Sequence, residues 1–177
     1  YYIDFSGNAP ALGGSAFGQI INTIGNQCAD IIDTACFCRA FETVQYLVNN
    51  EMLAAGHDVS SGGLITTLLE MCFPNTKGGL SINLTELPGK DIIEKSFSEN
   101  AGVVVQVKDE KKAKEYLKQQ KITFYKLGSP IKERALNYTN GEEYYKLAID
   151  SLRDIWFSTS YQLDRHQSTE KLALERF

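Results

Sequence analysis

The stretch that decides the fold is Ala54-Ala55-Gly56-His57-Asp58-Val59-Ser60-Ser61-Gly62-Gly63-Leu64. Its first part, residues 54–58, is a short and mainly apolar run, which predicts a buried strand. From Gly62 to Cys72 the apolar residues recur at helical spacing and predict a helix with one inward face. A strand, a tight glycine loop and a helix in this order are typical of a protein that layers helices on a sheet.

The loop between this strand and this helix is the candidate ligand site. Asp58 ends the strand, and ligands of open α/β sheets favour the carboxyl ends of strands. Gly62-Gly63 begins the helix, where unpaired N–H groups and a partial positive charge suit a phosphate group. Asp58 is a hard oxygen ligand of the kind that Mg²⁺ accepts beside nucleotide phosphates, and Ser60 adds a hydroxyl. The alternative interpretation is that Asp58 and Ser60 cap the helix while the glycines make the turn.

Three further features near this loop allow two interpretations each. His57 is a candidate general base, but a side chain on the opposite strand face from Asp58 is more typical of a packed or hydrogen-bonded residue. Gly13-Gly14-Ser15 is a second glycine-bearing helix start, which either shapes a ligand cleft or is an ordinary helix N-terminus capped by Ser15. Glu99-Asn100 is a polar pair that either faces a site or lies solvated in a loop.

The remaining pattern predicts an α/β (α+β) fold, a mixed sheet layered with helices. We divide the chain into residues 1–145, an α/β domain, and residues 146–177, the end of a long helix with its tail. That helix is expected from Glu142 to Arg165, and the tail from His166 to be loosely held. The other expected elements are strands at Tyr1–Ser6, Leu80–Leu84, Gly102–Val107, Ile122–Leu127 and Arg134–Tyr138, a turn at Gly128–Pro130, and helices at Ser15–Gly25, Asp33–Leu53, Asp91–Phe97 and Asp109–Gln119.

Composition excludes several classes of function. The chain has 177 residues, a net charge of −4 and a pI near 5.3, so a large nucleic-acid footprint is not expected. No apolar run reaches the length of a membrane span. Cys36 and Cys38 have C-x-C spacing without a second ligand pair, so we expect no zinc site and interpret the four cysteines as reduced, mostly buried thiols of a cytoplasmic protein.

The sequence lacks the constellation of a complete active site. No cysteine has a histidine neighbour, and neither a nucleophile elbow nor a Walker-type glycine loop occurs. We therefore assign no catalytic residue. The chain also begins without an initiator Met, and we interpret it as a fragment of a longer polypeptide.

Several motifs together resemble one superfamily. His57 to Leu64, followed by Leu68-Leu69-Glu70-Met71, resembles the H-D-x-S-x-G-G-L…L-x-E-M signature of the C-terminal domain in the aminoimidazole ribonucleotide synthetase superfamily. The segment from Ala11 to Ala16 resembles that domain's L-G-G-S entry, and the segment from Phe97 to Val107 resembles its F-x-E…G-x-x-x-Q-V strand. The resemblance implies the fold of that domain.

The end of the chain narrows the resemblance within the superfamily. Residues 151–165, Ser151 to Arg165 with Trp156 inside, resemble the L-R-x-x-W helix of the large, single-chain phosphoribosylformylglycinamidine synthases. It implies the C-terminal domain of the second synthetase half, with residues 146–177 leading toward a glutaminase domain. The implied reaction is ATP-driven amidation of formylglycinamide ribonucleotide with ammonia from glutamine, a step of purine biosynthesis that yields the amidine, ADP, phosphate and glutamate.

The resemblance also implies residue roles and partners. Asp58 is implied to bind Mg²⁺ and Ser60 to contact the nucleotide, ATP or ADP, in a site shared with other domains of the same polypeptide. Gly62, Gly63 and Glu99 are weaker ligand-cleft candidates, and Ser61 departs from the family, where Asp is common. Two alternatives stay open: a module for assembly that binds no ligand, and the corresponding domain of another superfamily member such as a selenophosphate synthetase.

Overall fold

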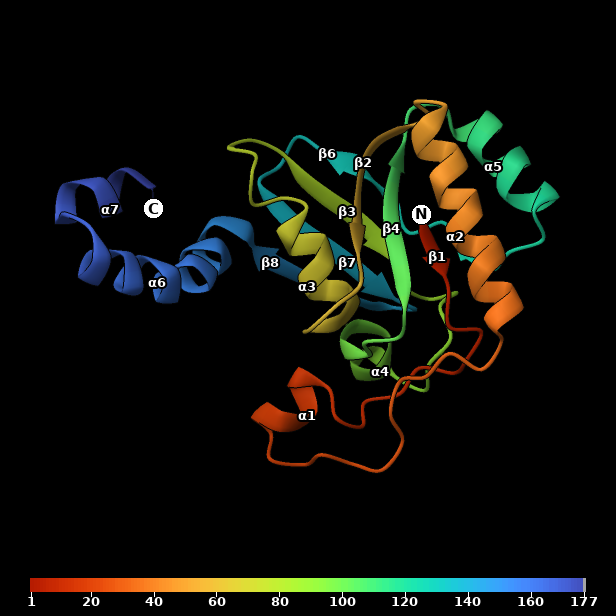
Figure 1. Ribbon diagram of the computed structural model, residues 1–177, viewed down its shortest axis with the longest axis horizontal. Helices are drawn as coiled ribbons and strands as arrows, with labels where there is room; N and C mark the ends of the chain where they lie inside the picture. The colour runs from red at the N-terminus through yellow and green to blue at the C-terminus, as the bar shows by residue number, and fades with distance from the viewer. Residues whose placement is uncertain (177) are drawn as a thin grey trace.

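The computed structural model describes residues 1–176, which form two four-stranded sheets with helices around them (Figure 1). The first sheet has the order β2-β4-β1-β5, and its three strand pairs are antiparallel. Its strands are β1 (Tyr2–Asp4), β2 (Leu53–Asp58), β4 (Gly102–Val107) and β5 (Phe124–Tyr125).

The second sheet has the order β6-β3-β7-β8 and is mixed. The β3–β7 pair is parallel, whereas β3–β6 and β7–β8 are antiparallel. The predicted α/β class with a mixed sheet is therefore confirmed, although the strands divide into two sheets. The strands are β3 (Gly79–Asn83), β6 (Gly128–Ile131), β7 (Ala135–Asn140) and β8 (Glu143–Ala148).

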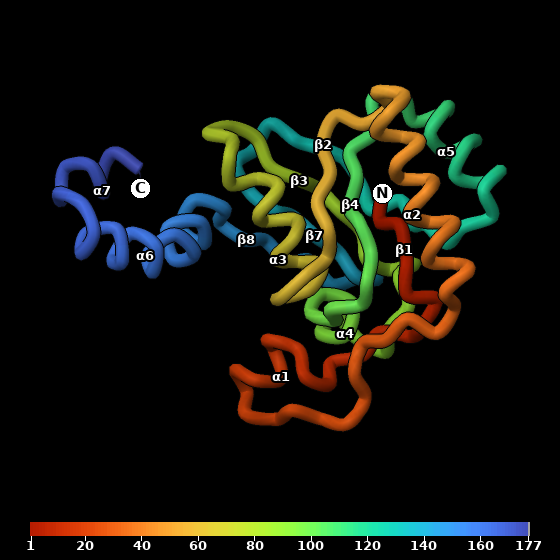
Figure 2. Tube along the Cα trace, in the orientation of Figure 1, coloured from red at the N-terminus to blue at the C-terminus, as the bar shows by residue number. Residues whose placement is uncertain are grey.

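Two cores lie on the two sides of the first sheet. Helices α2 (Thr34–Asn49) and α5 (Glu110–Gln119) cover one face, as Figure 2 shows, and α3 (Gly63–Glu70) packs between β2 and the second sheet. Helix α4 (Ile92–Phe97) contacts the start of α3. Buried residues of the α2–α5 core are Ile3, Phe5, Ala40, Leu47, Val105, Leu117 and Ile122; those of the other core include Val59, Leu64, Leu68, Ile82, Val104, Leu136 and Ile149.

The strand that leads into the candidate site is not buried, and this prediction was wrong. Residues 54–56 and Asp58 of β2 are exposed. Among residues 1–176, strand β2 is the edge of the first sheet and pairs only with β4, so one side of its backbone has no strand neighbour there. An apolar run can form such an edge as well as a central strand, and its periodicity alone does not separate the two.

The end of the chain also differs from the prediction. Residues 143–148 form β8 rather than the first part of a helix, and Gly141, at a φ of +62°, makes the β7–β8 turn. Asn140-Gly141 is a strong hairpin signal that the 3- and 4-residue apolar spacing obscured. Helices α6 (Ile149–Gln167) and α7 (Glu170–Arg176) then extend away from the sheets (Figure 1). The proposed domain boundary at residues 145/146 lies inside β8.

Smaller predictions needed correction too. The helix that begins after Ser15, α1 (Ala16–Ile20), ends well before Gly25, because Asn22 takes a φ of +54°. Residues 128–130 belong to β6 and do not form a turn. The thiols of Cys28 and Cys38 are exposed and that of Cys72 is buried, so the cysteines are not mostly buried. Within the part of the chain that the structure describes, every helix is too short or too polar to span a bilayer.

Candidate functional site

The loop from β2 to α3 reverses the chain on two glycines. Gly62 is the N-cap residue of α3 with a φ of +91°, and Gly63 follows with a φ of +72°. L-residues with a Cβ avoid this left-handed region, so both positions favour glycine. No side chain makes a capping hydrogen bond at this helix start. The interpretation that Asp58 and Ser60 cap the helix is therefore wrong, whereas the turn role of the glycines is confirmed.

Asp58 combines a fixed backbone with an exposed carboxylate. Its carbonyl oxygen accepts a hydrogen bond from Thr67 Oγ1 at 3.2 Å and lies 2.8 Å from His57 Nδ1. Its side chain is 76% exposed and lies 3.5 Å from that same His57 nitrogen. The carboxylate is therefore held at the rim of the loop, open to a ligand from outside this part of the chain.

Ser60 is the second exposed polar residue of the loop. Its carbonyl oxygen accepts a hydrogen bond from the Gly63 N–H at 3.0 Å, which closes the turn. Its hydroxyl is exposed and makes no hydrogen bond to any other residue in the range 1–176. Ser61 is exposed as well. The turn thus uses the backbone of Ser60 and leaves its hydroxyl available.

His57 is packed and bonded rather than open. Its side chain is 33% exposed; Nδ1 contacts the Asp58 carbonyl, and Nε2 lies 3.6 Å from Glu70 Oε2. Both ring nitrogens have protein neighbours, which fits the packed and hydrogen-bonded interpretation. Glu70, at the end of α3, has no role predicted from the sequence, although it belongs to the Leu68-Leu69-Glu70-Met71 motif.

Glu99 joins the two glycine-bearing helix starts. Its Oε1 accepts a hydrogen bond from the Gly62 N–H at 2.7 Å and another from the Ala16 N–H at 2.9 Å. The carboxylate therefore satisfies one N–H group at the start of α1 and one at the start of α3, where negative charge is stabilising. The solvated-loop interpretation of Glu99 is wrong, and the structure brings Gly13-Gly14-Ser15 beside the Gly62-Gly63 loop.

The neighbouring Asn100 fixes the loop that leads to α1. Its Oδ1 accepts from the Ala11 N–H at 3.1 Å, and its Nδ2 donates to the Ala9 carbonyl at 3.0 Å. Asn100 is 5% exposed, so the solvated interpretation is wrong for it too. Nearby, the buried Asp4 carboxylate accepts hydrogen bonds from the Ser6 N–H and hydroxyl. The pKa of the Tyr2 phenol is raised, mainly by burial and to a smaller extent by the negative charge of Asp4.

Tight packing gives the two glycines a second reason to be glycine. A Cβ on Gly63 would lie 2.6 Å from the backbone carbon of Phe97, and one on Gly62 would lie 2.5 Å from Thr66 Oγ1. The α3 start therefore touches the end of α4 through bare backbone. The contact with α4 explains Gly63, and the nearness of Thr66 explains Gly62, both without a ligand, so the part of these glycines in a ligand cleft stays a prediction.

This chain supplies at most part of a metal site. Among residues 1–176, no three His, Cys, Asp or Glu side chains group closely enough to hold an ion. Asp58 is one accessible hard oxygen, whereas Mg²⁺ takes octahedral coordination from carboxylates, phosphates and water. Its carboxylate fits one position of such a shell, and the other ligands would come from phosphate, water or other parts of a larger protein.

The geometry defines an α/β domain whose exposed polar loop precedes a buried helix, and the comparisons identify its family. Residues 32–138 match the family model described as AIR synthase related protein, C-terminal domain. This match covers more than half of the chain, so the chain belongs to that family. The matched segment runs from just before α2 to within β7 and includes the loop from Asp58 to Gly63.

Curated relatives extend the similarity over nearly the whole chain. A probable phosphoribosylformylglycinamidine synthase, chloroplastic/mitochondrial, of Arabidopsis thaliana is 33% identical over 94% of this chain. Phosphoribosylformylglycinamidine synthases of Homo sapiens and Dictyostelium discoideum are 30% and 32% identical over 98% and 94% of it. The chain spans only 12–14% of the length of these three relatives.

Solved structures support the fold. PurL of Thermotoga maritima complexed with FGAR has a TM-score of 0.65 over 86% of this chain and 27% of that chain, at 14% identity. The same protein complexed with ATP has a TM-score of 0.60 over 82% of this chain and 24% of that chain, at 15% identity. At this identity the likeness establishes the architecture alone.

Proposed function

We propose that the chain is one domain of a phosphoribosylformylglycinamidine synthase, a glutamine-dependent ligase of purine biosynthesis. The observation that supports this most strongly is the identity of 30–33% over 94–98% of the chain to synthases of three distant organisms. The whole enzyme would convert formylglycinamide ribonucleotide, ATP and glutamine to the amidine, ADP, phosphate and glutamate. The isolated domain would be inactive, since it presents no nucleophile with a base.

Within that enzyme, the domain contributes contacts to Mg²⁺ and a nucleotide. Asp58 is the proposed metal ligand and Ser60 the proposed nucleotide contact. Supporting observations are the exposed Asp58 carboxylate and the Ser60 hydroxyl, which has no hydrogen-bond partner among residues 1–176. Two of the similar solved structures are PurL complexed with ATP and with ADP, which supports a nucleotide for this family of domains.

Gly62, Gly63 and Glu99 have a supporting part in this proposal. They shape the loop, because Glu99 Oε1 holds the Gly62 N–H and the glycines allow the turn. The site is completed by other domains of the same polypeptide, and we propose a cytoplasmic location, although the plant relative is named as chloroplastic/mitochondrial. No nucleic acid or membrane is among the proposed partners.

The test is Asp58→Ala in the full-length polypeptide that carries this sequence. The purified protein is analysed for tightly bound nucleotide by chromatography and for magnesium by mass spectrometry. The expected result is loss of both. Asp30→Ala is a matched control, because Asp30 is exposed and accepts only from the adjacent Ile31 N–H. Unchanged nucleotide and metal content in Asp58→Ala would contradict the assignment.

The second candidate function is an assembly module that packs against other domains and binds no ligand. Exposed apolar side chains favour it, since several large ones lie on α1, on α2, on the segment between these two helices and on α6. They include Ile20, Ile24, Ile32, Phe41, Val48, Ile155 and Leu163. A selenophosphate synthetase domain has less support, because all three relatives above carry the other name. Contacts from Ser60 to a phosphate in a structure of the full-length protein would favour the first function over assembly alone.

A further inference from the structure

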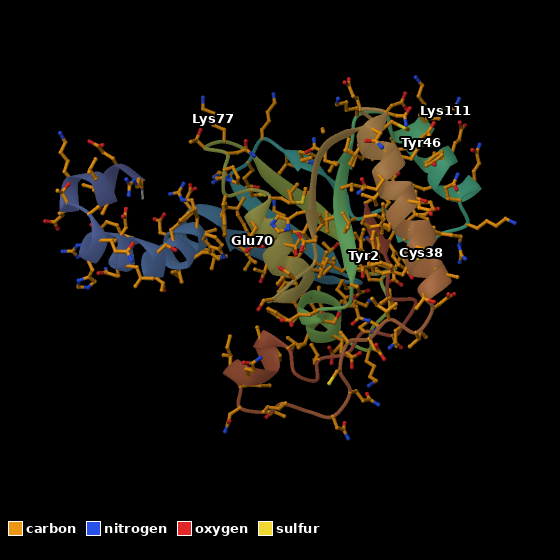
Figure 3. All side chains as sticks on the ribbon, in the orientation of Figure 1. Tyr2, Cys38, Tyr46, Glu70, Lys77 and Lys111 are labelled. Atoms are coloured by element: carbon orange, nitrogen blue, oxygen red, sulfur yellow. The ribbon has the colours of Figure 1, made fainter. Side chains whose placement is uncertain are left out.

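A chain of side-chain contacts leads from the candidate metal ligand to the projecting helix α6. Trp156 of α6 donates from Nε1 to Glu70 Oε1 at 3.1 Å, and Glu70 Oε2 lies 3.6 Å from His57 Nε2. His57 then contacts the Asp58 carbonyl through Nδ1 at 2.8 Å. Glu70, labelled on α3 in Figure 3, thus uses one carboxylate oxygen toward each neighbour.

Glu70 and Trp156 each make more than one contact. The Glu70 side chain is 18% exposed, whereas Trp156 is 49% exposed, so the carboxylate is partly shielded and its contact with the indole lies at the surface. The Trp156 ring also packs on Phe73 and Phe157, at centroid distances of 5.8 and 4.8 Å. One part of the indole therefore packs on aromatic rings, while its N–H donates to one oxygen of the Glu70 carboxylate.

Helix α3 also contacts Asp58 directly, through Thr67. Thr67 lies one turn before Glu70 on α3 and donates to the Asp58 carbonyl at 3.2 Å. Residues three apart share a helix face, so α3 presents Thr67 and Glu70 together to the end of β2. Thr67 contacts the Asp58 backbone directly, and Glu70 approaches it through the His57 ring, whose Nε2 lies 3.6 Å from Oε2.

We infer that Glu70 is a positioning residue for the Asp58 metal site and that it links this site to α6. The inference rests on the proposed function, because it assumes that Asp58 binds Mg²⁺. Groups that orient a metal ligand typically change metal affinity about 10- to 100-fold when they are removed. Removal of the Glu70 carboxylate is therefore expected to weaken Mg²⁺ binding without removing a ligand.

The experiment measures Mg²⁺-dependent ADP retention by the full-length polypeptide. ADP bound after gel filtration is recorded against Mg²⁺ concentration, which gives a midpoint and a plateau. Glu70→Ala is expected to raise the midpoint about tenfold with the plateau kept. Glu70→Gln keeps an acceptor for Trp156 and loses only the charge toward His57, and its midpoint is expected to rise about threefold. Glu115→Ala, an exposed change on α5, is the matched control and leaves the midpoint unchanged.

The link to α6 is tested by Trp156→Phe, which keeps an aromatic ring between Phe73 and Phe157 and removes the N–H donor. Trp156→Phe is expected to raise the Mg²⁺ midpoint of ADP retention in the wild-type background. It should not change that midpoint in the Glu70→Ala background, because the effects of two groups that act through one contact are not additive. Equal effects of Trp156→Phe in both backgrounds would overturn the link.

The outcomes separate this inference from the proposed function. Wild-type midpoints in Glu70→Ala and Glu70→Gln, together with loss of ADP in Asp58→Ala, overturn the inference alone. Retention of ADP and magnesium in Asp58→Ala overturns both. If Glu70→Ala yields no folded protein, the Glu70→Gln midpoint decides, and a value equal to that of Glu115→Ala overturns the inference.

Discussion

The two glycine-bearing helix starts resemble each other in sequence and differ in structure. At α1, Ser15 caps the helix, since its Oγ accepts from the Gly18 N–H at 3.1 Å. At α3, the N-cap is Gly62 and no side chain caps it. Helix α1 has five residues, while α3 has eight, six of them buried. The comparison teaches that the α3 start is the better candidate ligand site, because its N-cap residue has no side chain and the neighbouring Ser60 and Ser61 are exposed.

The two starts also differ in the space around their glycines. Gly14 and Gly63 have almost the same φ, +75° and +72°. A Cβ on Gly14 would meet nothing within 4 Å, whereas one on Gly63 would lie 2.6 Å from Phe97. Alanine substitutions at Gly14 and Gly63 therefore separate two contributions to the free energy of unfolding: backbone strain in the left-handed region, present at both positions, and overpacking, present at Gly63 alone.

Gly63→Ala is expected to have the largest effect of the substitutions considered. It should lower the free energy of unfolding by about 3 kcal/mol, since left-handed strain and a clash with unyielding backbone add together. Gly14→Ala should cost about 1 kcal/mol, the strain alone. Urea unfolding followed by circular dichroism measures both. Equal losses in the two variants would show that the α3–α4 contact is less tight than the structure has it.

Glu99→Ala is expected to have the next largest effect, because it removes the acceptor that the two starts share. Two N–H groups, of Ala16 and Gly62, lose a charged partner, and the free energy of unfolding should fall by about 2 kcal/mol. Hydrogen exchange at these two amides should accelerate together in the same variant.

Glu99→Gln is the control for this prediction. It keeps an oxygen acceptor in a side chain of the same size, so the decrease in the free energy of unfolding should be about half of that in Glu99→Ala. In Glu99→Ala, faster hydrogen exchange at the Gly62 amide with no change at the Ala16 amide would contradict the shared acceptor. The two helix starts would then be independent of each other.

The sequence was sufficient for much of the fold and for the place of the candidate site. Periodicity located α3, α5, β3 and β4 closely, and the loop from Asp58 to Gly63 connects a strand to a helix as expected. The bridging role of Glu99 could not be predicted, because its partners Ala16 and Gly62 lie 83 and 37 residues away in the chain. The exposure of β2 depends likewise on which strand lies beside it, and no local pattern encodes that.

The contact between Glu70 and Trp156 was hidden for the same reason, since 86 residues separate them. A residue at the end of an amphipathic helix is most often solvated, and only the position of α6 makes Glu70 a partner. Strand β8 differs from the predicted helix for another reason: the helical spacing of Tyr145, Ile149 and Leu152 reaches back into residues 143–148, whereas Asn140-Gly141 before them is typical of a hairpin.

The smallest expected effect comes from the serines of the two starts and sharpens the comparison most. Ser15→Ala removes a cap and should cost about 1 kcal/mol of unfolding free energy. Ser60→Ala should change it by less than about 0.5 kcal/mol, because its exposed hydroxyl has no partner within residues 1–176. In the full-length polypeptide the order reverses: Ser60→Ala should reduce ADP retention and Ser15→Ala should not. Equal ADP retention by the two variants, each folded, would mean that the uncapped α3 start is a feature of the fold alone and that the nucleotide contact lies on another residue.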